Sequence, residues 1–208
     1  MTDIKNIVFD LGGVIFNFDF EDANRTFAEL GVSLGPDAPN RQKVLRLLND
    51  YINGFISEPD FATQLLSFST RGLTKEAVIS ELQTFSGDLP VKRLEALVTL
   101  RKRYKVYLLS NINERMWQWT VGLMQKQGYN PEDCFDQVFL SYELQQAKPA
   151  PSIYQTMIDA TGLNPQQTLY FDDLKENAIA GAGFGLQAHI VKPNFLEECE
   201  AYSELFKQ

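Results

Sequence analysis

Short apolar segments recur along this chain and alternate with stretches of helical periodicity. The segments are residues 4–9, 105–109, 137–140, 168–171 and 188–191. They are apolar at nearly every position rather than at alternate ones, which predicts strands buried on both faces, as in a parallel sheet. Residues 90–103 and 152–161, between them, repeat apolar side chains every three or four positions, as amphipathic helices do. Strands that alternate with helices predict an α/β fold with a mainly parallel sheet.

The region between the first two predicted strands departs from this alternation. Residues 17–86 show helical patterns and no convincing strand after the first few positions; Gly31 marks a helix end and Ser57 a helix start. A structureless loop of about 70 residues would be unusual in a compact domain. We therefore expect two domains: a core made of residues 1–16 and 87–208, and an all-helical insertion made of residues 17–86.

The charge and the cysteine content of the chain argue against several classes of function. The chain carries 19 Lys and Arg against 27 Asp and Glu, a net charge of −8, which argues against broad binding of nucleic acid or of an anionic membrane. No apolar stretch approaches the roughly 18 residues of a membrane span, and no signal-peptide pattern is visible. Cys134 and Cys199 form no CxxC motif, which fits a reducing, cytoplasmic setting. His189 is the sole histidine and lies in a predicted strand, so catalysis would rest on carboxylates, lysine and a metal.

Polar side chains stand at the carboxyl ends of the predicted strands, where open α/β sheets bind their ligands. Asp10 ends the first strand, Ser110 ends the second, and Asp172 and Asp173 end the fourth. Lys148 follows the third strand. Each residue alone has an ordinary explanation as a cap, a solvated edge or a turn. Their joint occurrence at strand ends predicts a site.

These residue types together predict phosphoryl transfer assisted by a divalent cation. Magnesium suits the site because it prefers carboxylate oxygens, water and phosphate as ligands. Asp10 would be the nucleophile and a metal ligand, and Lys148 would neutralise negative charge. The Ser110 hydroxyl, with backbone N–H groups at a helix start, would bind phosphate oxygens. Gly12 and Gly13 would let the backbone turn sharply beside Asp10.

The segments around these residues resemble the four motifs of the haloacid dehalogenase-like (HAD) superfamily, in its order. They are residues 7–15, 108–111, 147–149 and 170–181. The resemblance implies a Rossmann-like three-layer sandwich with a small helical cap, and it is nearest to the sugar-phosphatase-like (alpha-D-glucose-1-phosphate phosphatase-like) branch. It implies that Asp10 is the nucleophile, Ser110 the phosphate-binding hydroxyl and Lys148 the phosphate-side lysine. It further implies that Asp172 and Asp173 bind magnesium, together with the main-chain carbonyl of Gly12.

One position departs from the superfamily pattern. Most of its phosphatases carry an acid/base Asp two residues after the nucleophile, where this chain has Gly12. Because general acid–base help is worth about 10²–10⁴ in rate, its loss favours a leaving group that departs with little protonation, such as that of a sugar 1-phosphate. Asp19, or a water held by Asn17, is a candidate substitute. Asn177 stands where many members have a further carboxylate, so its metal contact would be through water or absent.

Two alternatives to a phosphatase stay open. A carbon–halogen hydrolase of the superfamily also lacks the second Asp, but such enzymes need no magnesium, and the pair Asp172 and Asp173 counts against this alternative. A catalytically weak relative would bind phosphate-bearing ligands without turnover. A phospho-receiver domain uses similar residue types, but its acidic pair precedes the phosphorylated Asp and it has no long helical insertion.

We expect a monomeric enzyme whose partner is a small phosphorylated metabolite, in the first place a sugar phosphate, with no nucleic acid or membrane partner. The predicted substrate-binding residues are Ser110, Asn111, Lys148, Asp19 and Arg115. Arg115 is a candidate for a second anionic group on the substrate. Substrate choice would lie in the helical insertion, where Tyr51, Asn53 and Phe55 are candidates.

Overall fold

The computed structural model describes residues 3–18, 20–82 and 87–192. Its contacts divide the chain into two compact units. The sheet unit comprises residues 1–17 and 88–208, and the helical unit comprises residues 18–87. These bounds lie one residue from those that the sequence pattern predicts. Asp19, the candidate substitute for the missing acid/base, lies outside the described residues.

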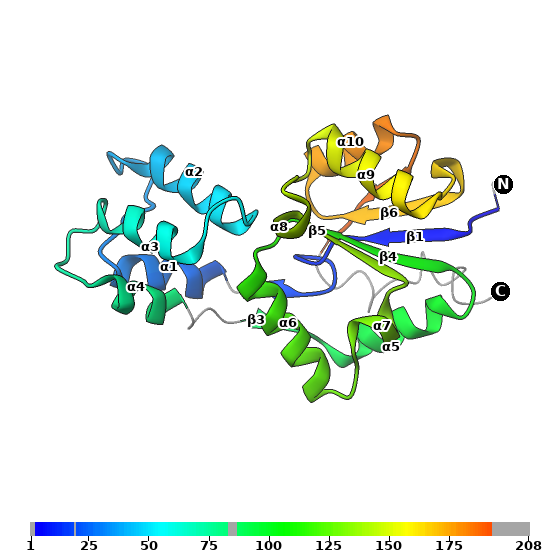
Figure 1. Ribbon diagram of the computed structural model, residues 1–208, viewed down its shortest axis with the longest axis horizontal. Coiled ribbons are helices and arrows are strands. Elements are labelled where there is room, and N and C mark those ends of the chain that lie inside the picture. The colour runs from blue at the N-terminus through cyan, green and yellow to red at the C-terminus, as the bar shows by residue number, and fades with distance from the viewer. Residues whose placement is uncertain (1–2, 19, 83–86, 193–208) are drawn as a thin grey trace. The chain divides into compact units, whose positions relative to one another are not determined.

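The sheet unit is built on a five-stranded sheet with the order β5-β4-β1-β6-β7 (Figure 1). The strands are β1 (Asn6–Phe9), β4 (Lys105–Ser110), β5 (Gln137–Leu140), β6 (Thr168–Asp172) and β7 (Gln187–Ile190). Every neighbouring pair runs parallel. β1, β4 and β6 are almost entirely buried, which explains why their sequences lack an apolar–polar alternation. The predicted parallel α/β sheet is confirmed.

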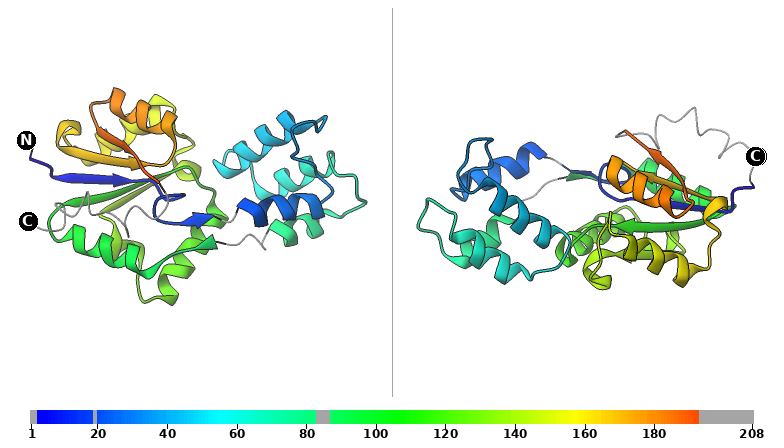
Figure 2. Two further views of the ribbon diagram at one scale, coloured as in Figure 1. Left: turned by 180° about the vertical axis from the view of Figure 1, so that it is seen from behind. Right: turned by 90° about the horizontal axis from the view of Figure 1, so that it is seen from above.

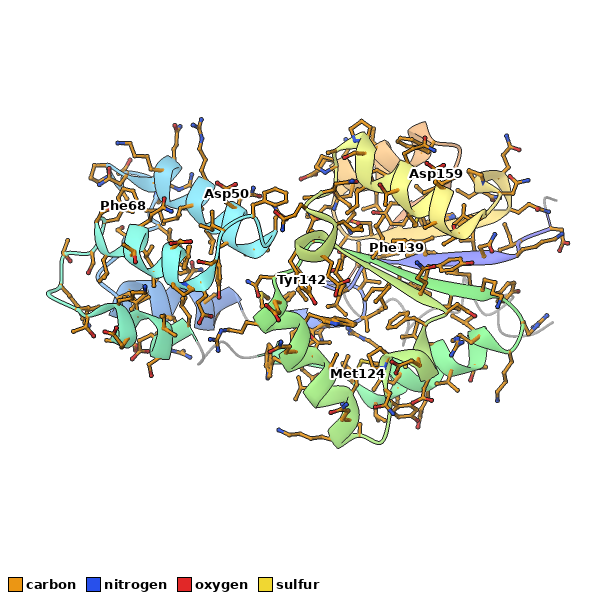
Figure 3. The ribbon with its side chains drawn as sticks, viewed as in Figure 1. Asp50, Phe68, Met124, Phe139, Tyr142 and Asp159 are labelled. Carbon is orange, nitrogen blue, oxygen red and sulfur yellow. The ribbon has the colours of Figure 1, made fainter. Side chains whose placement is uncertain are left out.

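Helices cover both faces of this sheet. On one face lie α5 (Val91–Arg101), α6 (Glu114–Lys126) and α7 (Pro131–Cys134); on the other lie α9 (Pro151–Thr161) and α10 (Lys175–Gly183) (Figure 1). The short elements α8 (Ser141–Leu144) and η1 (Pro165–Gln167) belong to the connections. Tyr154 and Met157 of α9 pack with Val8, Tyr170 and the β5 side chain Phe139, which Figure 3 labels. Side chains of α9 and of the strands β1, β5 and β6 therefore fill the space between this helix layer and the sheet.

The helical unit contains α1 (Phe20–Glu29), α2 (Arg41–Ile52), α3 (Glu58–Leu66) and α4 (Lys75–Leu82) (Figure 2). The Ser57 side chain caps α3 by accepting the Asp60 N–H at 3.2 Å, as expected for a helix start. The core of the unit is an apolar cluster that includes Phe27, Leu30, Val44, Tyr51, Phe61, Leu65 and Val78. The short strands β2 (Asn17–Phe18) and β3 (Gly87–Asp88) pair with each other at the points where the chain passes between the units.

Two smaller expectations concern the membrane and His189. Within the ranges that the structure describes, no helix is both long and apolar enough to cross a bilayer. His189 lies on β7 and stacks on Phe171, with ring centroids 5.4 Å apart. Its partial burial lowers the pKa of His189. This placement agrees with a packing role for His189.

Candidate active site

The strand register brings polar residues from distant parts of the chain to one edge of the sheet. Phe9 of β1 is paired with Leu108 of β4 and with Phe171 of β6. Asp10 follows Phe9, and its N–H donates to the Phe171 carbonyl at 2.9 Å. Asp172 follows Phe171, so the two acids stand at the same level of adjacent strands. This edge holds the carboxyl ends of all the parallel strands, where such sheets bind ligands.

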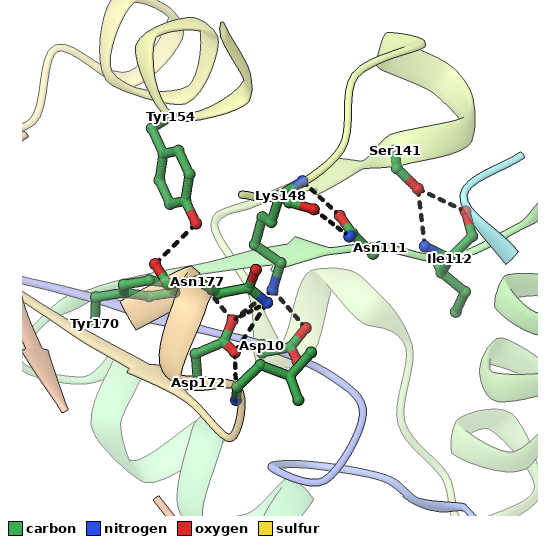
Figure 4. Close-up of polar contacts among 10 residues, drawn as sticks. Asp10, Asn111, Ile112, Ser141, Lys148, Tyr154, Tyr170, Asp172 and Asn177 are labelled. Atoms are coloured by element: carbon green, nitrogen blue, oxygen red, sulfur yellow. Dashed lines mark hydrogen bonds and ion pairs between the residues drawn. The ribbon is translucent and has the colours of Figure 1, made fainter. Parts of the chain in front are cut away.

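Lys148 lies between these two acids (Figure 4). Its Nζ is 2.8 Å from Asp10 Oδ1 and 2.7 Å from Asp172 Oδ2, and its side chain is fully buried. Burial alone would lower the pKa of Lys148, but the two carboxylates outweigh it and raise that pKa. The ammonium is therefore charged at neutral pH. One positive charge shared by two carboxylates leaves the group with an excess of negative charge.

Asp172 is held by a set of donors from its own motif. Tyr170 Oη donates to Asp172 Oδ2 at 2.5 Å, and the Leu174 N–H donates to Oδ1 at 2.9 Å. Asn177 Nδ2 lies 3.1 and 3.3 Å from the two carboxylate oxygens. A fully buried carboxylate is tolerated when donors surround it in this way. Asn177 stands where many members of the superfamily have a further carboxylate. In this chain its side chain donates to Asp172.

Within the described part of the chain, Asp10, Asp172 and Asp173 form a group that could hold a metal ion. Each offers one carboxylate oxygen, and these oxygens lie within 4.8 Å of one another. Burial raises the pKa of Asp10 to about 7, with Lys148 opposing and Asp172 reinforcing the shift. Burial also raises the pKa of Asp173, and the charge of Asp172 adds to it. Oxygen ligands that repel one another are the kind of donor set that a hard divalent cation stabilises.

Gly13 leaves the space that Asp173 occupies. A Cβ built at Gly13 would lie 2.3 Å from Asp173 Oδ2, and the backbone there has φ +71°. The turn around it is closed by hydrogen bonds to the carbonyls of Leu11 and Phe16, and these bonds do not use the carbonyl of Gly12. The left-handed conformation and the close approach of Asp173 explain why glycine stands at position 13, three residues after the nucleophile candidate.

The remaining predicted residues are placed as follows. Ser110 is the last residue of β4 and is buried. Asn111 follows it, and its side chain bonds to the backbone of Lys148. Arg115 lies in the first turn of α6 and is half-buried. The structure thus brings Asp10, Lys148, Asp172 and Asp173 together directly, and Asn111 through the main chain.

The helical-unit candidates are mostly interior residues. Tyr51 is buried, stacks on Phe61 at 4.2 Å between ring centroids, and donates its hydroxyl to Glu58. Asn53 is buried as well, whereas Phe55 is 40% exposed. Tyr51 therefore belongs to the core of the helical unit and not to a substrate surface, contrary to the expectation from the sequence.

Sequence reasoning missed Arg93, which is fully buried. Its Nη1 donates to the Ile15 carbonyl at 3.0 Å and to Asn17 Oδ1 at 2.9 Å. The Asn17 oxygen, considered above as a holder of water, accepts this bond. A signal existed, because Arg93 precedes Leu97 and Leu100 by four and seven positions and so shares the buried face of α5.

Comparison with known proteins agrees with the fold and the motifs. The pattern of the family described as haloacid dehalogenase-like hydrolase matches residues 4–185. The chain therefore belongs to the haloacid dehalogenase-like hydrolase family, which confirms the resemblance of its motifs. Among characterised relatives, D-ribitol-5-phosphate phosphatase of Bacteroides thetaiotaomicron is 33% identical over 185 residues, covering 88% of this chain and 90% of that protein.

Solved structures of HAD family proteins also resemble this chain over nearly its whole length. A HAD family enzyme from Bacteroides thetaiotaomicron superposes with a TM-score of 0.85 at 28% identity, covering 99% of this chain and all of the other. A structure of that enzyme in complex with magnesium and inorganic phosphate has a TM-score of 0.80, covering 98% of this chain and all of the other. A HAD-like family hydrolase from Porphyromonas gingivalis has a TM-score of 0.78 at 27% identity, covering 99% of this chain and 98% of the other.

Proposed function

We propose that this protein is a magnesium-dependent phosphatase of a small phosphorylated metabolite, with Asp10 as the nucleophile. The observation that carries the proposal is the ion cluster at the sheet edge, where Lys148 Nζ lies 2.8 Å from Asp10 and the oxygens of Asp10, Asp172 and Asp173 converge within 4.8 Å. Phosphoryl transfer needs these parts: a carboxylate nucleophile, a cation site and an ammonium. The names of the relatives support the same reaction class.

Asp10, Lys148 and Ser110 act in both halves of the reaction, and water takes part in the proton transfers. An oxygen of Asp10 attacks phosphorus, the bond from phosphorus to the ester oxygen breaks, and the alcohol oxygen leaves with the electron pair and takes a proton from water. Water then attacks phosphorus and gives a proton to the hydroxide left by the first step, the bond to Asp10 breaks with its electron pair returning to the carboxylate, and inorganic phosphate leaves. Lys148 supplies positive charge throughout, and the Ser110 hydroxyl binds a phosphate oxygen.

The residues present fit a magnesium ion. Asp10, Asp172, Asp173 and the main-chain carbonyl of Gly12 would hold it, all through oxygen atoms, as Mg²⁺ prefers. When bound, the ion neutralises charge on the phosphate oxygens and offsets the repulsion among the acids. Asp172 already accepts hydrogen bonds at both oxygens, so Asp10 and Asp173 have the freer carboxylates for this task.

We infer that the substrate is a phosphorylated sugar or sugar alcohol. The leaving-group argument from Gly12 favours a sugar 1-phosphate, because no acid stands two residues after Asp10. The relative named for D-ribitol 5-phosphate acts on the phosphate of a primary alcohol, a poorer leaving group. A sugar 1-phosphate therefore needs little help from a general acid, whereas the phosphate of a primary alcohol needs more.

A phosphate-release assay over a panel of sugar 1-phosphates, sugar 6-phosphates and sugar-alcohol phosphates tests the proposal, with magnesium or with a chelator. We expect release that needs magnesium and is lost in Asp10→Asn. A preference for the 1-phosphates would support the leaving-group argument. Gly12→Asp should then improve turnover of the primary phosphates most. No release above the Asp10→Asn control would refute the proposed function.

The same protein preparation separates the alternatives. Halide release from haloacids that persists in a chelator would identify a carbon–halogen hydrolase. A rise in melting temperature with sugar phosphates but without turnover would identify a binding protein.

A further inference from the structure

Lys148 lies in neither a helix nor a strand, although its ammonium must be placed within hydrogen-bond distance of two acids. A lysine side chain is a point charge on a flexible four-carbon stem. The position of its Nζ therefore depends on how firmly the backbone at residue 148 is held. Residues 145–150, between α8 and α9, are therefore fixed by something other than their own secondary structure.

The side chain of Asn111 supplies that fixation (Figure 4). The Lys148 N–H donates to Asn111 Oδ1 at 2.8 Å, and Asn111 Nδ2 donates to the Lys148 carbonyl at 2.8 Å. One planar amide thus satisfies both backbone polar groups of a single residue. Of the ordinary short side chains, only asparagine presents a donor and an acceptor side by side in this way. In an aspartate of the same shape, a carboxylate oxygen would face the Lys148 carbonyl oxygen, and neither of these two atoms can donate a hydrogen bond.

Asn111 is itself held in place. It follows β4 directly, and the next residue, Ile112, is bound on both sides by one hydroxyl: Ser141 Oγ accepts the Ile112 N–H at 2.8 Å and donates to the Ile112 carbonyl at 3.0 Å. Ser141 begins α8 and is fully buried. Two pairs of hydrogen bonds therefore join the loop after β4 to the segment from 141 to 148: one pair is made by the Ser141 hydroxyl and the other by the Asn111 amide.

We propose that Asn111 is a positioning residue of the active site: it holds the backbone of Lys148 so that Nζ lies between Asp10 and Asp172. This inference rests on the proposed function, because it assumes that Lys148 acts on the phosphate. It replaces the role expected from the sequence, in which Asn111 binds substrate. Both amide atoms bond to the backbone of Lys148, so the chain itself fixes the orientation of this side chain.

The test is a double-mutant cycle with Asn111→Ala, Lys148→Ala and the double variant, read as kcat and KM on a phosphate ester that the wild type hydrolyses with magnesium. Asn111→Ala should lower kcat about 10²-fold, since misplacement of a catalytic group by about 1 Å has that effect. KM should stay within about threefold, because no substrate contact is lost. In the Lys148→Ala background the same substitution should have little further effect, because Asn111 acts through Lys148.

Asn6→Ala is the matched control. Asn6 is also a buried asparagine with a side-chain hydrogen bond, from Nδ2 to Thr168 Oγ1 at 3.1 Å, but it lies at the opposite end of β1. It should lower the melting temperature as Asn111→Ala does, while kcat stays within about threefold of wild type. Equal loss of kcat in both variants would show a general packing effect and overturn the proposal.

Two other results would overturn it. A rise in KM with kcat unchanged would make Asn111 a substrate contact, and full additivity in the cycle would mean that it acts independently of Lys148. If the wild type releases no phosphate above Asp10→Asn, the proposed function fails instead. The cycle is then read on the affinity for inorganic phosphate with magnesium, where non-additivity supports the positioning role and additivity refutes it.

Discussion

The sheet unit and the helical unit bury different chemistry. Among the described residues, the charged side chains that are buried, Asp10, Arg93, Lys148 and Asp172, all belong to the sheet unit. The helical unit buries an apolar cluster and, of polar residues, only Thr26 and Asn53 in its described part. Apolar burial stabilises a fold directly, whereas buried ion pairs roughly offset their own desolvation. The sheet unit therefore buries charges that add little to stability, whereas the helical unit buries side chains that stabilise it. Substitutions in the first should change activity, and substitutions in the second should change the free energy of unfolding.

Asp10→Asn should have the largest effect, and on activity alone. Phosphate release should fall by at least about 10⁴-fold, or about 5.5 kcal/mol of activation free energy. Stability should stay the same or rise, because Lys148 keeps its bond to Asp172 while the excess negative charge disappears. Turnover and thermal unfolding are measured on the same sample. A loss of several degrees in melting temperature would mean that the ion cluster is structural.

Phe61→Ala should have the largest effect on stability. Phe61 is fully buried in the helical unit and stacks on Tyr51, so its truncation should cost about 3–5 kcal/mol in the free energy of unfolding. Denaturant unfolding measures this. Phe55→Ala, at a residue of the same unit that is 40% exposed, is the control and should change stability by less than about 1 kcal/mol. Similar costs for the two would contradict the assignment of stability to the buried apolar cluster of the helical unit.

Magnesium should stabilise the sheet unit. At about 100 times its Kd, an ion that binds only the folded state adds about 2.7 kcal/mol. The rise in melting temperature should vanish in Asp173→Asn, which removes a carboxylate of the converging group. Hydrogen exchange locates the effect: added protection should fall on residues around β1 and β6. Protection confined to α2 and α3 would contradict the assignment of the cation site.

Gly13→Ala should impair both the fold and the cation site. The new Cβ would meet Asp173 Oδ2 and would hold an alanine at φ +71°, at a cost of about 1–3 kcal/mol. Gly162→Ala is the matched control, since Gly162 has φ +64° but no atom within 4 Å of the added Cβ. Both should lose stability from backbone strain, but only Gly13→Ala should weaken magnesium binding. Equal magnesium affinity in the two variants would show that displacement of Asp173 does not affect magnesium binding.

Asp136→Asn should have the smallest effect, and it should depend on pH. Asp136 accepts the Val106 N–H and pairs with Arg101 and Lys105. Burial alone would raise the pKa of Asp136, but these donors outweigh it and lower that pKa.

A depressed pKa in the folded state means that Asp136 stabilises the protein above its unfolded pKa of about 3.9, and that this stability is lost as pH falls through the folded value. The variant should be less stable by about 1 kcal/mol at pH 7. The difference should shrink below about pH 4. Urea unfolding at several pH values measures it, with the exposed Asp159→Asn as control. A difference that persists at low pH would assign the effect to packing.

Much of this organisation could be predicted from the sequence. The buried strands show as continuous apolar runs, and because parallel strands end at one edge, Asp10 and Asp172 were expected together although the chain between them is long. Helix starts such as Ser57 were readable from capping chemistry.

The hydrogen bonds that hold the side chains of the site in place could not be predicted in the same way. Tyr170 looks like an ordinary core residue of β6, and only the period of two along a strand places its ring on the same face as Asp172. The pairing of Asn111 with the Lys148 backbone joins residues 37 positions apart, through a connection with no periodic pattern. Such bonds depend on the direction of individual side chains, which no sequence pattern specifies.

The insertion of the helical unit also sets the order in which the protein can assemble as it is synthesised. Residues 18–87 are contiguous in the sequence, whereas β1 pairs with a strand far along the chain, since Asn6 and Thr168 are 162 positions apart. At about 5–20 residues per second, the strand that precedes Asp10 remains unpaired with β6 for roughly 8–30 s. During that time Asp10 has neither its ammonium partner nor the other acids. The acids of the site can therefore come together only after β6 has been made.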